Sequence, residues 1–156
     1  MISINVPGWR NLMLDTLLCD FNGTLATDGI LSDVVKEKLT SLAKEIRIVV
    51  ITSDTNGTVR EELKDLPIEV EIIEKGTEAM SKRFLLDKFG SMSTAFMGNG
   101  ANDEKIMGAS AFSVCVIGNE GAFVKAINNA HIVVYKPEDA LDLFLKPTRV
   151  VSGLRR

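Results

Sequence analysis

The stretch LLCDFNGT, from Leu17 to Thr24, decides how the rest of the chain is interpreted. In it an apolar run ends in an aspartate, Asp20, and a turn with glycine and threonine follows at once. Apolar runs of this kind are typical of buried parallel strands, and ligands bind at the carboxyl ends of such strands. The stretch therefore predicts a nucleophilic carboxylate at the mouth of a parallel sheet. The simpler alternative is that Asp20 only caps the turn.

The overall composition excludes several classes of protein. The chain has 156 residues, of which 46% are hydrophobic and 25% charged, a balance typical of one globular domain over residues 1–156. The net charge is -3 and the only basic cluster is Arg155-Arg156, so we expect neither a nucleic-acid partner nor a membrane surface as partner. No apolar run approaches the ~20 residues that a membrane-spanning helix needs.

The cysteines and the N-terminus bear on the cellular compartment. Cys19 and Cys115 both lie in apolar, strand-like runs, which favours two buried thiols in a reducing cytoplasm over a disulfide. The segment Met1–Asn5 lacks the basic region and the apolar region of a signal peptide. We therefore expect a cytoplasmic protein.

Short apolar runs alternate with amphipathic stretches along the chain. The runs rich in Val and Ile predict strands at Leu14–Asp20, Ile46–Thr52, Val70–Ile73, Thr94–Met97, Ser113–Ile117 and Ile132–Val134. The stretches between them predict helices at Ser32–Lys44, Thr58–Leu66, Thr77–Phe89, Asp103–Ala109, Ala122–Asn129 and Glu138–Leu145. This alternation predicts a three-layer, Rossmann-like α/β fold, in which helices cover both faces of a parallel sheet.

The first thirteen residues depart from that alternation. Ser3–Val6 and Asn11–Leu14, on either side of Pro7-Gly8, predict an N-terminal β-hairpin at residues 1–13. Trp9, the only tryptophan, is expected either to cover the sheet or to make a subunit contact. His131 begins the last predicted strand, far from the motifs in chain order, and is interpreted as structural.

Polar residues follow the ends of the predicted strands. Asp20 ends the first strand, Thr52 and Ser53 end the second, and the fourth runs into the loop GNGAND, Gly98–Asp103. Lys82 lies on the helix between the third and fourth strands. Because the carboxyl ends of parallel strands share one edge of a sheet, these residues are expected to converge on one crevice.

These motifs, in this order, resemble those of the haloacid dehalogenase (HAD) superfamily of phosphohydrolases, over about residues 14–135. The first HAD motif, Asp-x-Asp-Gly-Thr, is matched by Asp20–Thr24, and the second, a strand ending in Thr or Ser, by Val49–Thr52. The third motif, a lysine, is best matched by Lys82. The loop Gly98–Asp103 is most similar to the Gly-Asp-Gly-x-Asn-Asp of P-type ATPases. Within the superfamily the chain therefore looks like the soluble P-type ATPase-like phosphatases.

The resemblance implies a Mg²⁺-dependent phosphohydrolase that acts through a phospho-Asp20 intermediate. Thr52 would bind a phosphoryl oxygen, and Lys82 would neutralise charge on the phosphate and on Asp20. The implied phosphate-binding residues are Phe21, Gly23, Thr24 and Ser53, with Gly23 allowing nearby amides to point at the phosphate. The implied metal ligands are Asp20, Asn22 through its backbone carbonyl, Asn99 and Asp103.

Each assignment has a simpler alternative. Thr52 could satisfy a local amide, and Ser53 and Asp54 could be ordinary turn residues. Asp103 could do no more than cap the following helix. Lys82 could be a solvated helix lysine, with Lys75 next to the phosphate instead.

Asparagine replaces aspartate at two positions of the family pattern. Asn22 stands where many members have the general acid–base, and Asn99 stands where the family has a metal-binding carboxylate. An amide cannot exchange the proton, and a general acid or base typically contributes ~10²–10⁴-fold to the rate. The sequence therefore favours a slow or selective phosphohydrolase. The alternatives are a catalytically weakened phosphate-binding or phospho-accepting regulatory module, and a purely structural subunit.

No cap domain fits between the motifs. Between Asn22 and Thr52 there is room only for one helix and a flap at Leu25–Leu31, with Asp28-Gly29 as its turn. An open site of this kind would admit a small phosphorylated substrate or a bulkier one. Capless HAD proteins often form oligomers, so the resemblance also implies a homo-oligomer, with the N-terminal hairpin and Trp9 as the candidate contact.

Overall fold

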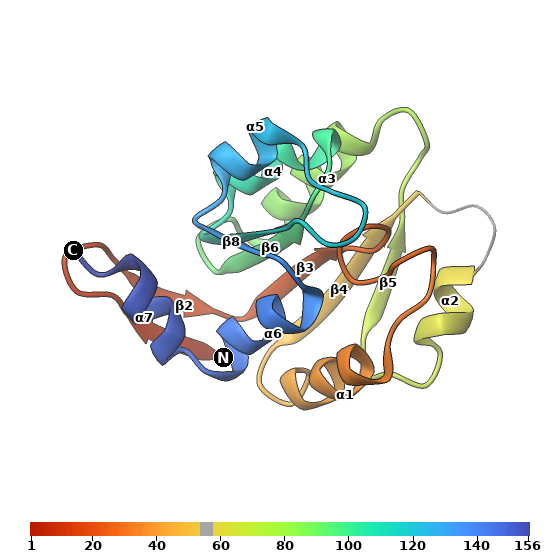
Figure 1. Ribbon diagram of the computed structural model, residues 1–156. Coiled ribbons are helices and arrows are strands. Elements are labelled where there is room, and N and C mark those ends of the chain that lie inside the picture. The colour runs from red at the N-terminus through yellow and green to blue at the C-terminus, as the bar shows by residue number, and fades with distance from the viewer. Residues whose placement is uncertain (54–57) are drawn as a thin grey trace.

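The computed structural model describes residues 1–53 and 58–156. Its centre is a parallel sheet in the order β5-β4-β3-β6-β7-β8 (Figure 1). The strands are β3 Thr16–Asp20, β4 Arg47–Thr52, β5 Glu69–Ile72, β6 Thr94–Gly98, β7 Phe112–Val116 and β8 Ile132–Val134. Each predicted strand is present within two residues of its expected bounds, and the expected α/β fold is confirmed.

Helices cover both faces of this sheet (Figure 1). On one face lie α1 Asp33–Leu42, α2 Thr58–Leu63 and α6 Pro137–Leu145, and on the other lie α3 Glu78–Phe89, α4 Glu104–Ala109 and α5 Val124–Asn129. A short 3-10 helix, η1 Ala101–Asp103, precedes α4. Neighbouring residues of β3 face opposite layers, because Leu17 and Cys19 belong to one buried apolar cluster and Leu18 to the other.

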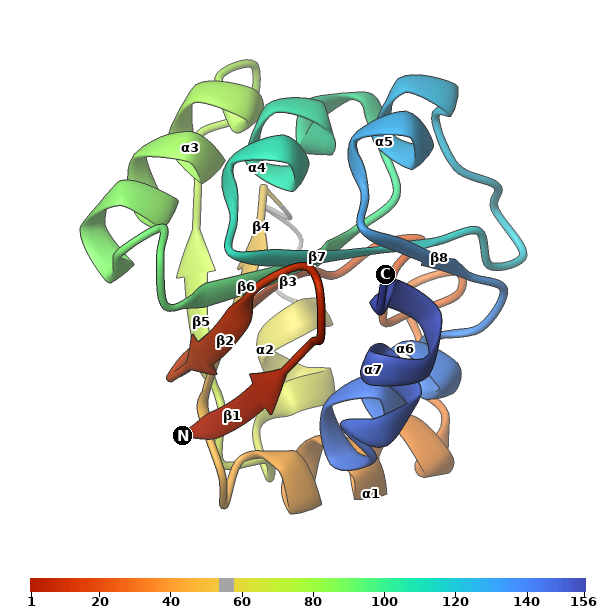
Figure 2. The ribbon, with the colours of Figure 1, turned by 90° about the vertical axis from the view of Figure 1, so that its left-hand side faces the viewer.

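The N-terminal residues form the expected antiparallel hairpin. Its strands are β1 Ile2–Asn5 and β2 Asn11–Leu14, paired from Ile2 with Leu14 to Asn5 with Asn11. A helix at the other terminus, α7 Thr148–Leu154, lies beside this hairpin (Figures 1 and 2). The hairpin and α7 together close the sheet at the end where the parallel strands begin.

Trp9 and His131 both belong to this closed end. Their ring centres are 5.0 Å apart, and the Arg10 guanidinium lies 4.2 Å above the Trp9 ring. The Nδ1 atom of His131 accepts a hydrogen bond from the Ser113 amide at 3.0 Å. Because His131 precedes β8 and Asp20 ends β3, the two residues lie at opposite ends of the parallel strands.

Two features differ from the sequence-based expectation. Helix α7 was not predicted, since a short segment with two valines, a serine and a glycine has weak helical propensity. It is stabilised by packing, because Val150 is fully buried and Leu154 contacts the main apolar cluster. Helices α2 and α5 are shorter than expected: α2 ends at Leu63, and α5 begins at Val124.

The segment after Asp20 forms a small flap and leads directly into α1. Within it Asp28 and Gly29 have φ values of 51° and 78°, and Thr27 and Ile30 exchange two backbone hydrogen bonds of 3.1 and 3.0 Å. This is the two-residue turn that Asp-Gly favours. Among the described residues, only the flap and α1 separate β3 from β4, and only α2 and β5 separate β4 from α3. No helix of the described part of the chain is long and apolar enough to cross a membrane.

Candidate active site

Asp20 ends the central strand β3 and faces a cavity of about 240 Å³ at the carboxyl edge of the sheet. The strands on either side, β4 and β6, bring their own final residues to the same edge. The cavity is lined by Asp20, Asn22, Thr52, Ser53, Glu78, Lys82, Asn99, Gly100 and Asn102. Most of the polar residues singled out from the sequence therefore converge, as the parallel topology requires.

Lys82 is the buried cation of this cavity. Its side chain is 2% exposed, and its Nζ atom donates to Asp20 Oδ1 at 3.1 Å, Asn102 Oδ1 at 2.8 Å and Asp103 Oδ1 at 2.6 Å. All three ammonium protons are thus directed to oxygen atoms. Lys75 is exposed in the loop before α3, so the structure places Lys82, and not Lys75, against Asp20.

Asp103 is fully buried and holds the β6–α4 loop together. Its Oδ2 atom accepts hydrogen bonds from the Asn99 and Gly100 amides, both at 2.9 Å, while Oδ1 accepts from Lys82. Its side chain makes no capping bond to α4, and its hydrogen bonds join Lys82 to the loop instead. Gly98 is needed here, because a Cβ atom at this position would lie 2.6 Å from Asp103 Oδ2.

The charges of the site depend on one another. Burial, together with the nearby Asp103 charge, raises the pKa of Asp20 to about 7, although Lys82 and the Phe21 amide act to lower it. Burial acts to lower the pKa of Lys82, but the charges of Asp20 and Asp103 outweigh it, and the net change is upward. Lys82 therefore stays charged, while Asp20 can change its protonation state near neutral pH.

Asn99 links the first motif to the loop that follows β7. Its Oδ1 atom accepts from the Thr24 hydroxyl at 3.1 Å, and its Nδ2 atom donates to the Gly121 carbonyl at 3.2 Å. Gly23 has a φ of 76°, and a Cβ atom there would lie 2.4 Å from Asn99 Nδ2. An amide suits this position because its Nδ2 group donates to the Gly121 carbonyl. A carboxylate would place an oxygen acceptor opposite that carbonyl oxygen, which is itself an acceptor.

The remaining predicted residues have different surroundings. The Asn22 side chain is exposed at the cavity, and the Phe21 side chain is buried in the core, leaving only its backbone near Asp20. Thr52 is 4% exposed, and the Ser53 hydroxyl contacts Glu78. Asp54 lies outside the described residues.

Sequence reasoning gave no role to two residues of the cavity, Asn102 and Glu78. Asn102 accepts a hydrogen bond from Lys82, and its position in the GNGAND loop was the available signal. Glu78 begins α3 and accepts from the Gly76 amide at 2.9 Å. It precedes Lys82 by one helical turn, a spacing that could have indicated a shared face.

The oxygen atoms of the site suit a hard cation such as Mg²⁺, although of the two aspartates only Asp20 is left to face it. The described residues contain no group of three or more His, Cys, Asp or Glu side chains arranged for a metal. Asp103 already accepts from Lys82 and two amides, whereas the Asp20 Oδ2 atom accepts a long hydrogen bond of 3.4 Å from Thr24. The oxygen ligands that remain are the Asp20 carboxylate and neutral oxygens of Asn22 and Asn99. This set fits Mg²⁺, but it carries less negative charge than a site with two carboxylate ligands.

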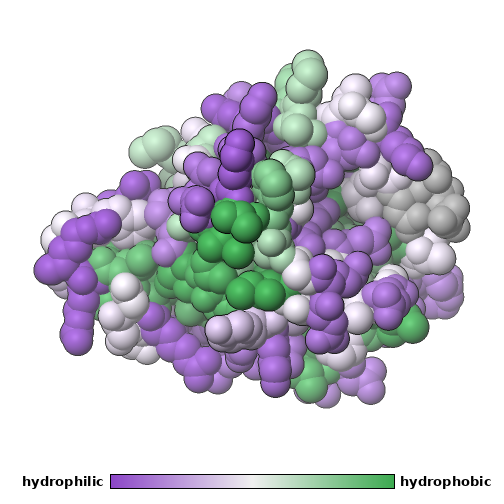
Figure 3. All heavy atoms as spheres, turned by 45° about the horizontal axis from the view of Figure 1, so that its top comes forward, coloured by the Kyte–Doolittle hydropathy of each residue, from purple (hydrophilic) through white to green (hydrophobic). Residues whose placement is uncertain are grey.

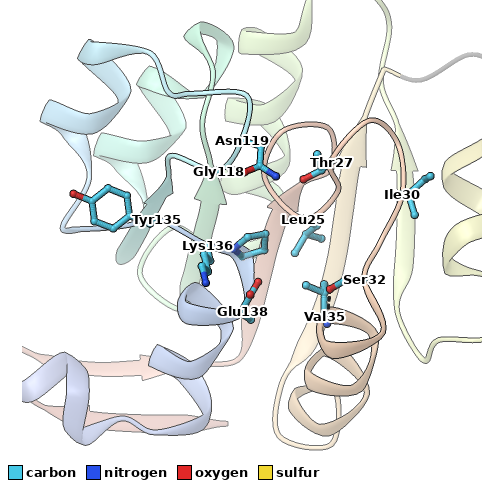
Figure 4. A pocket seen from close by; sticks show the side chains of 11 residues that line it. Leu25, Thr27, Ile30, Ser32, Val35, Gly118, Asn119, Tyr135, Lys136 and Glu138 are labelled. Atoms are coloured by element: carbon cyan, nitrogen blue, oxygen red, sulfur yellow. Dashed lines mark hydrogen bonds between the residues drawn. The ribbon is translucent and has the colours of Figure 1, made fainter.

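A larger cavity, of about 400 Å³, lies on the other side of the flap (Figure 4). Leu25 and Thr27 of the flap, Val35 of α1, and Lys136 and Glu138 at the start of α6 are among its lining residues. It contains neither Asp20 nor Lys82, so the smaller cavity is the candidate active site.

Crystal structures of HAD-type phosphatases have the same fold as this chain. The 3-deoxy-D-manno-octulosonate 8-phosphate phosphatase of Moraxella catarrhalis, in complex with magnesium, phosphate and the KDO sugar, has a TM-score of 0.73 at 16% identity and 90% coverage of both chains. The cobalt-bound enzyme of Haemophilus influenzae has a TM-score of 0.72 at 16% identity, covering 92% of this chain and 94% of the enzyme. A putative HAD family hydrolase of Streptomyces avermitilis has a TM-score of 0.65 at 17% identity, covering 82% of this chain and 80% of the hydrolase. The fold is therefore of the HAD type.

Sequence comparison finds two uncharacterized archaeal proteins at higher identity. The chain is 45% identical over 40 residues to the uncharacterized protein MJ0072 of Methanocaldococcus jannaschii, covering 91% of that protein and 26% of this chain, and it belongs to the same family. It is 44% identical over 59 residues to the uncharacterized protein MJ0073 of the same organism, 38% of this chain. The chain spans 63% of the length of MJ0073. No model of a known protein family matches the sequence.

Proposed function

We propose that this protein is a Mg²⁺-dependent phosphohydrolase that acts through a phospho-Asp20 intermediate, with low or selective turnover. The observation that carries the proposal is the contact of Lys82 with both Asp20 and Asp103 inside a small polar cavity at the carboxyl edge of a HAD-type sheet. The GNGAND loop further supports a place among the soluble P-type ATPase-like phosphatases.

In the first step an Asp20 carboxylate oxygen attacks the phosphorus atom of the substrate. The Asp20 O–P bond forms, and the bond from phosphorus to the leaving-group oxygen breaks. Lys82 offsets the repulsion between this carboxylate and the incoming phosphate. Because Asn22 has no proton to give, the leaving oxygen must be a good leaving group or take its proton from water.

In the second step water hydrolyses the aspartyl phosphate and restores the Asp20 carboxylate. Most HAD-like arrangements would use an acidic side chain at position 22 to take a proton from this water. The Asn22 amide cannot do so, and the phospho-enzyme is therefore expected to be long-lived.

The proposed metal ligands are the Asp20 carboxylate, the backbone carbonyl of Asn22 and the side chain of Asn99. Asp103 would position Asn99 by holding the loop that carries it. When bound, Mg²⁺ would supply positive charge that stabilises the transferring phosphoryl group. Because Asp20 is then the only carboxylate among the proposed ligands, binding should be weak until phosphate adds its own oxygens.

A small phosphorylated molecule is the proposed substrate, since the cavity has a volume of only about 240 Å³ and a polar lining. The solved neighbour from Moraxella catarrhalis is a phosphatase of a sugar phosphate, which is in keeping with this class. The fully buried Cys19 and Cys115 support a place in the reducing cytoplasm.

The second candidate, a phospho-accepting regulatory module, is favoured by the two asparagines at positions 22 and 99. A phosphatase screen with Mg²⁺, comparing the wild type with Asp20→Asn, separates the proposals. Multiple turnovers by the wild type and none by Asp20→Asn support the phosphohydrolase. A single stoichiometric phosphorylation supports the module, and equal release by both proteins excludes Asp20 as the nucleophile.

A further inference from the structure

An apolar groove runs along one free edge of the sheet, between β5 and α3. Its volume is about 570 Å³, and its lining includes Ile72, Met80 and Phe84, which are 43%, 74% and 69% exposed. Isolated exposed apolar residues are common, but several around one groove mark an interaction site. The groove is separate from the candidate active site, although both use α3.

The strand that borders this groove has an open side. Within the described residues β5 pairs only with β4, and Figure 2 shows β5 at the edge of the sheet with α3 above it. An open edge presents backbone donors and acceptors to a further strand. The groove and the open edge together form one surface, here called the β5–α3 edge and defined by Glu69–Ile72, Glu74 and the α3 residues Met80, Phe84 and Lys88.

Charge at the two ends of the β5–α3 edge indicates what covers it. Glu71 and Glu74 line the end at which β5 finishes, whereas Lys88 lies near the end of α3, where its charge acts on Glu69 at the start of β5. Among the described residues, Glu71, Glu74 and Lys88 form no ion pair. A two-fold axis through the middle of this edge would exchange its ends and bring each Lys88 to the acidic end of the other copy.

We propose that the β5–α3 edge is a self-association surface, on which a second copy of this chain docks about a two-fold axis with its β5 antiparallel to the first. Phe84, in the middle of α3, then lies near the axis, and Met80 packs between the two helices. The two sheets become one continuous sheet across the interface. This surface differs from the hairpin and Trp9 suggested by the sequence, and it depends on no step of the proposed chemistry.

The other edge of the sheet is the natural comparison. It is formed by β8, which has three residues, and its Val133 is 38% exposed. Figure 3 shows a mostly hydrophilic face of the molecule with hydrophobic residues gathered near its middle. A β8 contact would also extend the sheet, so the sedimentation experiment includes a variant of this edge.

Sedimentation equilibrium of the full chain tests the interface. The wild type is expected to be a dimer, and Phe84→Glu should weaken the dimer at least about tenfold, because a central aromatic residue is replaced by a charge. Met92→Glu is the matched control, since Met92 is 84% exposed and does not line the groove. A wild type that stays monomeric, or a dimer weakened by Val133→Glu but not by Phe84→Glu, would overturn the proposal.

Charge exchange tests the two-fold arrangement itself. Lys88→Glu and Glu74→Lys should each weaken the dimer, and the double variant should restore it, because the pair is re-formed in the opposite sense. If the double variant forms a dimer no tighter than that of the weaker single variant, the antiparallel arrangement is contradicted. Phosphatase activity is measured separately, so loss of the dimer and failure of the proposed chemistry remain distinguishable.

Discussion

In the proposed mechanism, Asn22 decides how quickly a phosphorylated Asp20 turns over. Its side chain is exposed at the cavity, so an aspartate of nearly the same shape would fit without repacking. Asn22→Asp should raise turnover about 10–1,000-fold with a sugar phosphate and less with an aryl phosphate, whose leaving group needs no proton. Steady-state phosphate release measures the turnover of wild type and variant with each of the two substrates.

Asn119→Asp is the matched control for this experiment. Asn119 is exposed in the loop after β7 and lines the larger cavity, so the substitution adds the same charge away from Asp20. An equal gain from both variants, or no gain from Asn22→Asp with either substrate, would remove the argument that the site lacks an acid.

Asn99 should combine a structural role with weak metal binding. Asn99→Asp loses the solvent-exposed hydrogen bond to the Gly121 carbonyl and sets two acceptors against each other, which should lower the free energy of unfolding by about 0.5–1.5 kcal/mol. The added carboxylate should tighten Mg²⁺ binding without phosphate. Urea unfolding and calorimetric titration of Mg²⁺ measure the two effects. An unchanged stability would contradict the role of the Gly121 contact.

Asp20 should titrate near neutral pH in the metal-free protein. Burial, together with the Asp103 charge, raises its pKa to about 7. The nucleophilic carboxylate is therefore lost as the pH falls below 7, and Mg²⁺ should move this transition to lower pH by favouring the charged form. Carbon-detected NMR of the Asp20 carboxyl group measures the midpoint. Titration near the ordinary value of 3.8 would contradict the buried geometry.

The sequence indicated the two central charged residues of the cavity better than the contacts that support them. Asp20 and Lys82 stand in a recognisable order along the chain, and the structure brings them together. The contacts of Asn102 with Lys82, and of Asn99 with Gly121, depend on loops that are far apart in sequence. No local sequence pattern indicates contacts between loops that are so far apart in the chain.

At the scale of elements, strands were easier to predict than helices. The buried strands β6 and β7 have no exposed residue, so their apolar runs are continuous and easy to locate. Helix α7 has no comparable pattern and forms because it packs beside the hairpin. Tertiary packing decides such short helices, and sequence periodicity does not report it.

Asp142 on α6 joins three elements through charge. It is 7% exposed, and it accepts from Lys38 of α1 at 2.5 Å, from Lys146 at 3.1 Å and from Arg149 of α7 at 3.2 Å. Asp142→Asn should lower the free energy of unfolding by about 1–3 kcal/mol, because three cations lose their shared partner while remaining partly solvated. Urea unfolding measures the change, and Asp139→Asn, exposed on the same helix, is the control.

The effect of this substitution should depend on pH. Burial acts to raise the pKa of Asp142, but hydrogen bonds from Lys38 and Lys146 lower it below its ordinary value. The stabilisation is therefore present above about pH 4 and is lost as the pH falls and the carboxyl group protonates. A difference between wild type and variant that persisted unchanged well below pH 4 would contradict the ion network.

At the scale of the whole molecule, the two ends of the parallel strands have different tasks. The carboxyl ends carry Asp20 and the loops around it, whereas the hairpin, α7 and the Trp9–His131 contact close the opposite end. Trp9 is half-buried by this packing, which favours the covering role over a subunit contact. The free edge at β5 remains the better surface for self-association.

Trapping the phospho-enzyme tests the central claim most directly. The protein is incubated with an acyl phosphate and Mg²⁺, quenched in acid and examined by intact mass and peptide mapping. The proposal predicts one phosphoryl group on the peptide that contains Asp20, released by hydroxylamine, absent in Asp20→Asn and shorter-lived in Asn22→Asp. Phosphate release without this adduct, or an adduct at another residue, would contradict it.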